Sequence, residues 1–98
     1  MLIDARTIPD NTNFDTDICI IGAGAAGITL AREFIGTSLQ VCLLESGGFD
    51  WDSETQSLYQ GEIVGDRYFP LDVARTRYFG GTTNHWEGAS ILFNEIGF

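Results

Sequence analysis

The pattern of apolar and polar positions is most regular within residues 17–45. An apolar run at 18–21 leads into the glycine-rich stretch 22–27, an amphipathic segment follows, and a second apolar run occupies 41–44. Apolar runs without alternation are typical of central strands in a parallel sheet that is covered on both faces. The pattern therefore predicts a strand, a turn, a helix and a second strand, joined by a right-handed crossover into a βαβ unit.

The amphipathic segment predicts a helix over 25–35. Its expected apolar face combines two rows of residues, Ala26, Leu30 and Phe34 beside Gly27, Ala31 and Ile35. Arg32 and Glu33 are expected on the water side. Gly36 follows, and we expect it to end the helix in a left-handed conformation.

The flanking regions lack a regular period. Residues 1–16 are expected to form a lead-in loop with a short edge strand at 2–3. Residues 46–98 form a long irregular stretch, which in a compact domain is usually either functional or disordered. This stretch is too aromatic for disorder, since it holds Trp51, Tyr59, Tyr68, Phe69, Tyr78, Phe79 and Trp86. We interpret it as a surface that folds over a large flat ligand.

Two short helices are predicted within this irregular stretch. Ser53 is expected to cap a helix over 53–60, with Gln56 as its capping-box partner and Gly61 as the stop. A second helical patch is expected over 71–77.

The glycine-rich stretch carries the chemistry of a dinucleotide site. Gly22 permits a sharp turn out of the strand, Gly24 lets the backbone approach a pyrophosphate, and Gly27 lets the helix pack closely on the strand. The first turn of the helix would point free N–H groups and its positive dipole end at phosphates. Glu45 follows at roughly the 20-residue spacing of an acid that accepts from ribose hydroxyls.

The alternative is a glycine-rich turn of an α/β domain that binds nothing. The complete pattern of strand, turn, helix, second strand and terminal acid favours the nucleotide site. Glu45 also disfavours a cofactor with a 2′-phosphate, because two anions would meet there. NAD and FAD are therefore favoured over NADP.

A second glycine pair precedes a group of short polar side chains. Gly80 and Gly81 are followed by Thr82, Thr83 and Asn84. Such a turn could touch the pyrophosphate or the flavin edge. It could equally be a tight turn before a helix, with Thr82 or Thr83 as the N-cap.

Three further side chains near this pair are open to more than one interpretation. His85 is the only histidine, and it could be a structural hydrogen-bonding group, a flavin contact or a covalent flavin link. Arg75 and Arg77 could face a pyrophosphate or could be solvated.

Charge and cysteine content exclude several classes of function. The 98 residues carry a formal charge of −9, so a phosphate-rich polymer would be repelled and no nucleic-acid partner is expected. Cys19 and Cys42 fall in the two predicted strands and are expected to be buried free thiols. Without a CxxC spacing or a ligand cluster, neither a metal nor a redox role is expected.

The chain also lacks signals for membranes or export. No apolar run approaches the roughly 20 residues of a membrane span. The polar, acidic N-terminus has neither the basic nor the apolar region of a signal peptide. We therefore expect a cytoplasmic protein without a membrane span.

Nearly the whole chain resembles the N-terminal part of the glucose–methanol–choline (GMC) oxidoreductases. The resemblance rests on IIGAGAAG with the following LLESGG, and on RYFGGTTNHWEG. Many FAD and NAD enzymes share the first motif, whereas the second is much more specific. Glu87 departs from the family pattern, which has a glycine at this position.

The resemblance implies an FAD-dependent oxidoreductase that moves a hydride from a CH–OH group of an alcohol or sugar to the flavin. The first glycine turn and Glu45 would hold the ADP half, and the second glycine segment would lie along the pyrophosphate and isoalloxazine. In some relatives a histidine at the position of His85 is bonded covalently to the flavin. The expected cofactor-binding residues are Gly22, Gly24, Ala26, Gly27, Glu45, Ser46, Gly80, Gly81, Thr82, Asn84 and His85.

The family's catalytic base lies far downstream of these motifs, and no catalytic residue is expected within residues 1–98. We therefore expect the chain to be the N-terminal portion of one FAD-binding domain, incomplete relative to the family fold. An NAD-binding dehydrogenase domain and a non-catalytic nucleotide-binding fragment are the alternatives.

Overall fold

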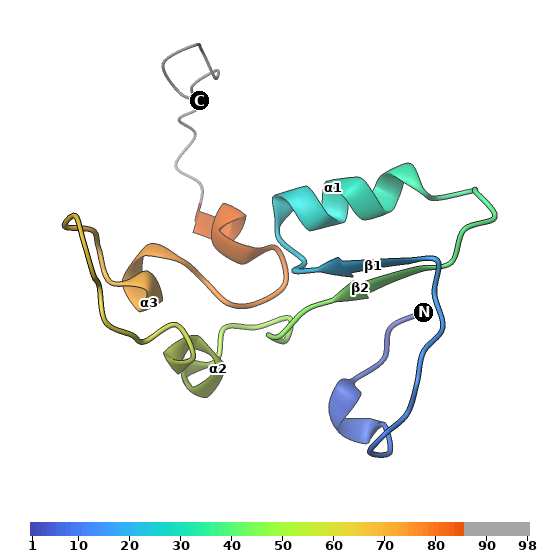
Figure 1. The fold of residues 1–98 in the computed structure, drawn as a ribbon, viewed down its shortest axis with the longest axis horizontal. Coiled ribbons are helices and arrows are strands. Elements are labelled where there is room, and N and C mark those ends of the chain that lie inside the picture. Colours follow the sequence, from blue (N-terminus) through green and yellow to red (C-terminus); the bar gives the residue numbers. More distant parts are fainter. Residues whose placement is uncertain (86–98) are drawn as a thin grey trace, which may run out of the picture.

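The computed structural model describes residues 1–85 and has an α/β layout of short elements. Two strands form its sheet, with one helix of nine residues between them in sequence. The elements in chain order are η1 (Ala5–Thr7), β1 (Ile18–Ile21), α1 (Ala25–Glu33), β2 (Val41–Leu44), α2 (Ser53–Ser57), α3 (Leu71–Ala74) and η2 (Gly81–His85), as Figure 1 shows.

The two predicted strands are confirmed, and they pair in parallel. The register places Ile18 opposite Val41 and Ile21 opposite Leu44. At the entry of β1, the N–H of Asp17 donates to the carbonyl of Gln40 over 3.0 Å, and the N–H of Gln40 donates to the Asp17 carboxylate over 2.7 Å. This reciprocal pair fixes the register where the strands begin.

Helix α1 begins where predicted, but its apolar face is rotated from the expected one. The half-buried positions are Gly27, Ile28, Ala31 and Phe34, whereas Leu30 is 49% exposed and Ile35 is 77% exposed. The helix packs with Gly27 against β1, and this contact decides which side faces the sheet. The helix ends at Glu33, two residues before the predicted end, and Gly36 has the expected positive φ of 84°.

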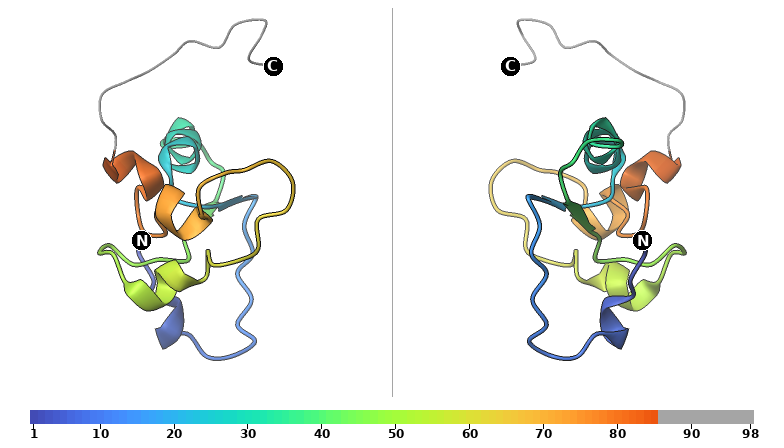
Figure 2. Two further views of the ribbon diagram at one scale, coloured as in Figure 1. Left: turned by 90° about the vertical axis from the view of Figure 1, so that its left-hand side faces the viewer. Right: turned by 90° about the vertical axis from the view of Figure 1, so that its right-hand side faces the viewer.

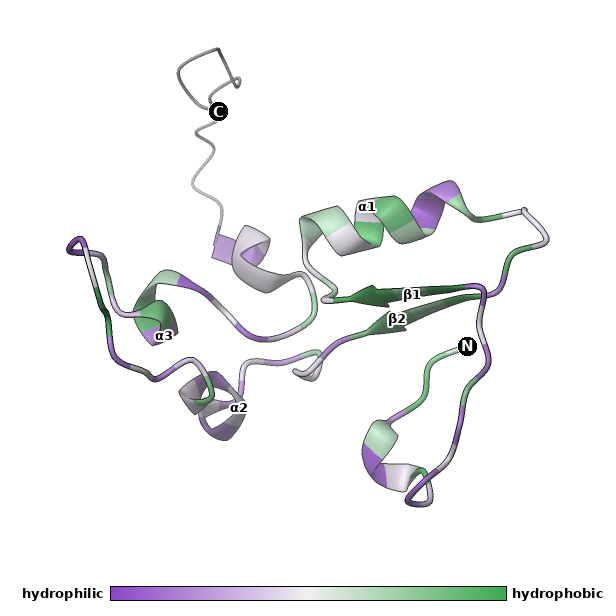
Figure 3. Ribbon diagram, viewed as in Figure 1, coloured by the Kyte–Doolittle hydropathy of each residue, from purple (hydrophilic) through white to green (hydrophobic). Residues whose placement is uncertain are grey.

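The prediction that the strands are covered on both faces is wrong for residues 1–85. Helix α1 lies on one side of the strand pair, and in this part of the chain no helix packs on the other side (Figures 1 and 2). Both strands are strongly apolar (Figure 3), yet Ile21 is 86% exposed. The prediction of buried thiols is wrong for the same reason, since Cys19 is exposed and Cys42 is half-buried.

The apolar core of the described residues is small. Ile20 and Ala23 are the buried apolar side chains in residues 1–85, and Gln56 is buried with them at 6% exposure. The side chain of Gln56 makes three hydrogen bonds across the irregular segment. Its amide donates to the carbonyls of Asp72 and Arg75 over 2.7 and 2.6 Å, and its oxygen accepts from the N–H of Arg77 over 3.0 Å.

The predicted capping box at Ser53 is therefore wrong. Asp52 is the N-cap of α2, and its carboxylate accepts from the N–H of Thr55 over 2.7 Å. The Gln56 side chain bonds to the segment 72–77 and does not cap the helix. The helix also ends at Ser57 rather than at residue 60, and α3 covers only Leu71–Ala74 of the patch predicted at 71–77.

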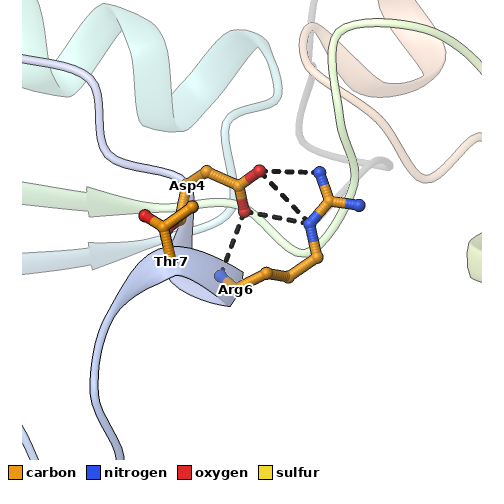
Figure 4. Close-up of polar contacts among 3 residues, drawn as sticks. All are labelled: Asp4, Arg6 and Thr7. Carbon is orange, nitrogen blue, oxygen red and sulfur yellow. Dashed lines mark hydrogen bonds and ion pairs between the residues drawn. The ribbon is translucent and has the colours of Figure 1, made fainter.

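The predicted edge strand at 2–3 is absent from the described lead-in, which forms the 3₁₀ turn η1. Asp4 caps this turn by accepting from the N–H of Arg6 over 3.0 Å, and its carboxylate pairs with the Arg6 guanidinium at 2.7 Å (Figure 4). The hydrogen bonds from Arg6 lower the pKa of Asp4 to about 2. Both side chains are exposed, so the pair orders the turn locally without adding much to stability.

No helix among residues 1–85 combines the length and apolar character that a membrane crossing requires.

We expect Gln56→Leu to destabilise the segment 72–77 selectively. The substitution leaves two carbonyls and one N–H without their partner, and because these groups are partly buried each loss costs about 1 kcal/mol. Native-state hydrogen exchange should show lost protection at the Arg77 amide. Gln60→Leu, at an exposed glutamine, is the matched control and should leave that amide protected. Equal protection in both variants would contradict the clamping role.

Candidate functional site

The first glycine turn joins the end of β1 to the start of α1. The N–H of Gly22 donates to the carbonyl of Leu44 over 2.7 Å, which extends the pairing of the strands by one bond. Gly22 has a φ of 100°, which a residue with a side chain rarely adopts. A Cβ on Gly27 would lie 1.9 Å from the Gly22 carbonyl oxygen, so the close packing expected of Gly27 is confirmed.

The start of α1 is open to a ligand on one side. Gly24 is the N-cap and has no side chain to accept from the first turn of the helix. The N–H groups of that turn have no intrahelical acceptor, and the helix dipole adds a partial positive charge there. A Cβ on Gly24 would meet no atom of the described residues within 4 Å. This end of the helix can therefore accept a phosphate group at close range.

Glu45 lies at the end of β2, beside the first turn. One carboxylate oxygen accepts from the N–H of Ala23 over 2.7 Å, and the other accepts from the N–H of Gly47 over 2.9 Å. Partial burial by itself would raise the pKa of Glu45, but the N–H groups of Gly47, Ala23 and Ser46 outweigh it and the pKa is lowered. The carboxylate is therefore charged at neutral pH, and it ties the glycine turn to the strand end.

The second glycine turn packs directly on the first one. The N–H of Gly80 donates to the carbonyl of Ala23 over 2.8 Å, and Gly80 forms a parallel bridge with Gly24. A Cβ on Gly81 would lie 3.4 Å from the Gly24 Cα. Two motifs that lie far apart in sequence thus form one backbone-lined surface.

The polar residues after this pair brace their own turn. The Asn84 amide donates to the Phe79 carbonyl over 2.8 Å, and the Thr83 hydroxyl donates to the Gly80 carbonyl. The Thr82 hydroxyl accepts from the N–H of Thr76 over 3.2 Å. The glycine pair is therefore a tight turn that leads into η2, and its contact with a pyrophosphate or a flavin stays a prediction. Neither threonine is an N-cap, because both lie within η2.

His85 is exposed at the end of η2. Its Nε2 lies 3.4 Å from the Tyr78 hydroxyl, and the two rings are nearly perpendicular. Trp86 and Glu87, which belong to the same sequence motif, lie outside the described residues.

A cavity of about 360 Å³ opens next to Glu45. It is lined by Ile21, Gly22, Leu44, Glu45, Ser46, Tyr59 and Arg77. The Arg77 guanidinium carbon lies 4.7 Å from the centre of the Tyr59 ring, which is a cation–π contact. Arg77 is half-buried, whereas Arg75 is exposed, so the two arginines have different environments.

The structure brings together most of the predicted site residues. Gly22, Gly24, Gly27, Glu45, Gly80 and Gly81 are joined by the contacts above, and Ser46 lines the cavity. Ala26 is exposed on the first turn of α1, and Thr82, Asn84 and His85 contact their own segment.

Sequence reasoning missed the contributions of Tyr59 and Gln56. Neither residue belongs to a recognisable motif, because each acts on a segment about 20 residues further along the chain, at Arg77. A buried position for a glutamine in an irregular stretch is visible only in the tertiary structure.

No protein-family profile, curated protein or solved structure matches the chain. Among residues 1–85 no three His, Cys, Asp or Glu side chains gather as a metal site would require. What the site can do therefore follows from its own geometry: it offers free N–H groups, a charged carboxylate and an adjoining cavity.

We expect Gly27→Ala and Gly24→Ala to differ sharply in stability. The Gly27 methyl group would lie 1.9 Å from a backbone oxygen, so the helix must move, at a cost of about 3 kcal/mol. The Gly24 methyl group meets open space and should cost no more than about 1 kcal/mol. Thermal unfolding followed by circular dichroism measures both, and equal losses would contradict the packing role of Gly27.

We expect Glu45→Gln to lower the free energy of unfolding at pH 7 by about 1–2 kcal/mol, because the new amide group places its own donor against a backbone N–H. Since the pKa of Glu45 is lowered on folding, its contribution is present above the ordinary value of 4.5 and is lost as the pH falls through the folded pKa. The difference from wild type should therefore shrink below pH 4.5. Urea titrations across this range test this, with the exposed Glu62→Gln as control.

Proposed function

We propose that this chain is the FAD-binding part of an oxidoreductase of the GMC type, built on a Rossmann-like βαβ unit. Its full enzyme would act on CH–OH groups of an alcohol or sugar. The observation that supports this most is the contact between the two glycine turns beside Glu45. A turn that held one phosphate alone would not need a second glycine segment packed against it.

The residues present fit a dinucleotide. The open start of α1 at Gly24 would accept the diphosphate, with Gly22 and Gly27 shaping the turn around it. Glu45 would accept from the ribose hydroxyls at Oε2, which within residues 1–85 accepts from the N–H of Ala23 alone. Oε1 already accepts from the N–H of Gly47 and, over 3.4 Å, from the Ser46 hydroxyl.

The charge on Glu45 is maintained by backbone donors, so it would repel a 2′-phosphate. This favours FAD or NAD over NADP as the ligand of the proposed site.

The second glycine turn would extend the binding surface toward the flavin. The backbone of Gly80 and Gly81 lies directly against that of Gly24. Asn84 and Thr82 would hold this turn in shape, and His85 would contact the flavin or be linked to it covalently. When bound, FAD supplies the hydride acceptor. We assign the general base that alcohol oxidation needs to no residue of this chain.

An NAD-dependent dehydrogenase domain is the second candidate. Such a domain continues after the acid with a regular helix and a further parallel strand. Within residues 46–85 the chain instead forms the short helices α2 and α3 and returns to the first turn. This path favours FAD over NAD. A non-catalytic nucleotide-binding module would share the same geometry.

We expect the chain to bind FAD more tightly than NAD or NADP. Titration with FAD, followed by flavin fluorescence, should saturate, and the Gly24→Ala variant should bind at least about 10-fold more weakly because its methyl group obstructs the diphosphate. Gly61→Ala, which also meets no atom within 4 Å, is the matched control and should bind like wild type. Preference for NAD, or failure to bind any of the three, would overturn the proposal. FAD binding without alcohol oxidation is the expected behaviour of the chain alone.

A further inference from the structure

Two residues that line the cavity beside Glu45, Tyr59 and Arg77, have no role in the FAD site proposed above. They differ in character from the apolar side chains of Ile21 and Leu44 that also line the cavity. The cavity thus combines a carboxylate, an apolar surface and a planar cation. Adenosine offers the matching set: a diol, an apolar ring face and a ring that stacks.

The position of Arg77 is fixed by its backbone before any ligand arrives. Its N–H donates to the buried Gln56 side chain over 3.0 Å. Its carbonyl lies so close to Gly47 that a Cβ there would be 2.2 Å from the oxygen. Held on both sides, the residue can present its side chain with little further loss of entropy.

The Arg77 side chain has hydrogen-bonding capacity to spare. Its Nε is buried and has no acceptor among residues 1–85, and the neighbouring Thr76 hydroxyl oxygen is likewise buried without a partner there. Buried polar atoms of this kind are rare and call for a physical explanation. Both atoms are enclosed by the protein, so a ligand in the cavity would meet the exposed part of the guanidinium and not Nε.

We propose that Arg77, held over Tyr59, binds the adenine ring of the nucleotide. This inference rests on the proposed function, because Glu45 must hold the ribose for the ring to enter this cavity. A guanidinium is planar and weakly hydrated, so it can stack on Tyr59 with one face and on a purine with the other. Ile21 and Leu44 would contact the ring from the apolar side.

A role in binding the diphosphate fits Arg77 less well. The proposed binding site of the diphosphate is at Gly24 and the start of α1. Gly24 is not among the residues that line the cavity. A doubly charged group would also lie next to the Glu45 carboxylate and against apolar side chains. The cavity therefore suits the base rather than the phosphates.

The experiment compares Arg77→Lys with Arg75→Lys, at an exposed arginine two positions away. Both keep the positive charge and replace a planar guanidinium, but only Arg77→Lys removes one from the cavity. FAD titrations by flavin fluorescence should show about 10-fold weaker binding for Arg77→Lys and no change for Arg75→Lys. Circular dichroism confirms that each variant is folded.

Competition experiments separate the base from the phosphates. ADP and inorganic pyrophosphate should each displace bound FAD from wild type. Arg77→Lys should weaken the binding of ADP and leave the binding of pyrophosphate unchanged. If Arg77→Lys binds FAD and ADP like wild type, stacking by Arg77 is refuted while the FAD site stands. If Arg77→Lys weakens the binding of pyrophosphate as much as that of ADP, Arg77 contacts the phosphates and the inference is overturned. If wild type binds no FAD, the proposed function fails together with the inference.

Discussion

The arrangement depends on direct backbone contact between two glycine turns. The Gly80 N–H donates to the Ala23 carbonyl over 2.8 Å, and a Cβ on Gly81 would lie in van der Waals contact with the Gly24 Cα, 3.4 Å away. Gly80 and Gly81 have φ values of 90° and 58°, which residues with a side chain rarely adopt, so glycine at these positions allows the second turn to follow this path. Because the turns touch, the second turn is anchored at the ends of the strands, next to Glu45 and the start of α1.

Hydrogen bonds do much of what an apolar core does in larger domains. Residues 1–85 bury few apolar side chains, and a chain of this size has little apolar surface to bury. Gln56 instead binds three backbone groups of the segment 72–77, and Glu45 binds the N–H groups of two loops. Such bonds are directional, so they specify the path of irregular chain that apolar contacts alone would leave undefined.

The one-sided sheet connects the fold to the cavity. Ile21 and Leu44 belong to the strand face that α1 does not cover, and both also line the cavity beside Glu45. The cavity therefore has an apolar part, formed by these side chains at the strand ends, and a charged part, formed by the Glu45 carboxylate. Tyr59, after α2, and Arg77, after α3, complete the lining of this cavity because both segments of the chain return to it.

The sequence by itself determined the local elements whose signals are short in range. Apolar runs predicted both strands, the glycine spacing predicted the turn and the start of α1, and Glu45 was expected at the strand end, as observed. Local pattern could not determine which face of α1 packs, since two apolar rows compete and the contact of Gly27 decides. It could not show that α1 covers only one face of the sheet in this part of the chain. Nor could it show that Gln56 bonds to the segment 72–77 instead of capping α2, or that Arg77 contacts Tyr59. Those features arise from contacts between distant segments, and no periodicity or spacing records them.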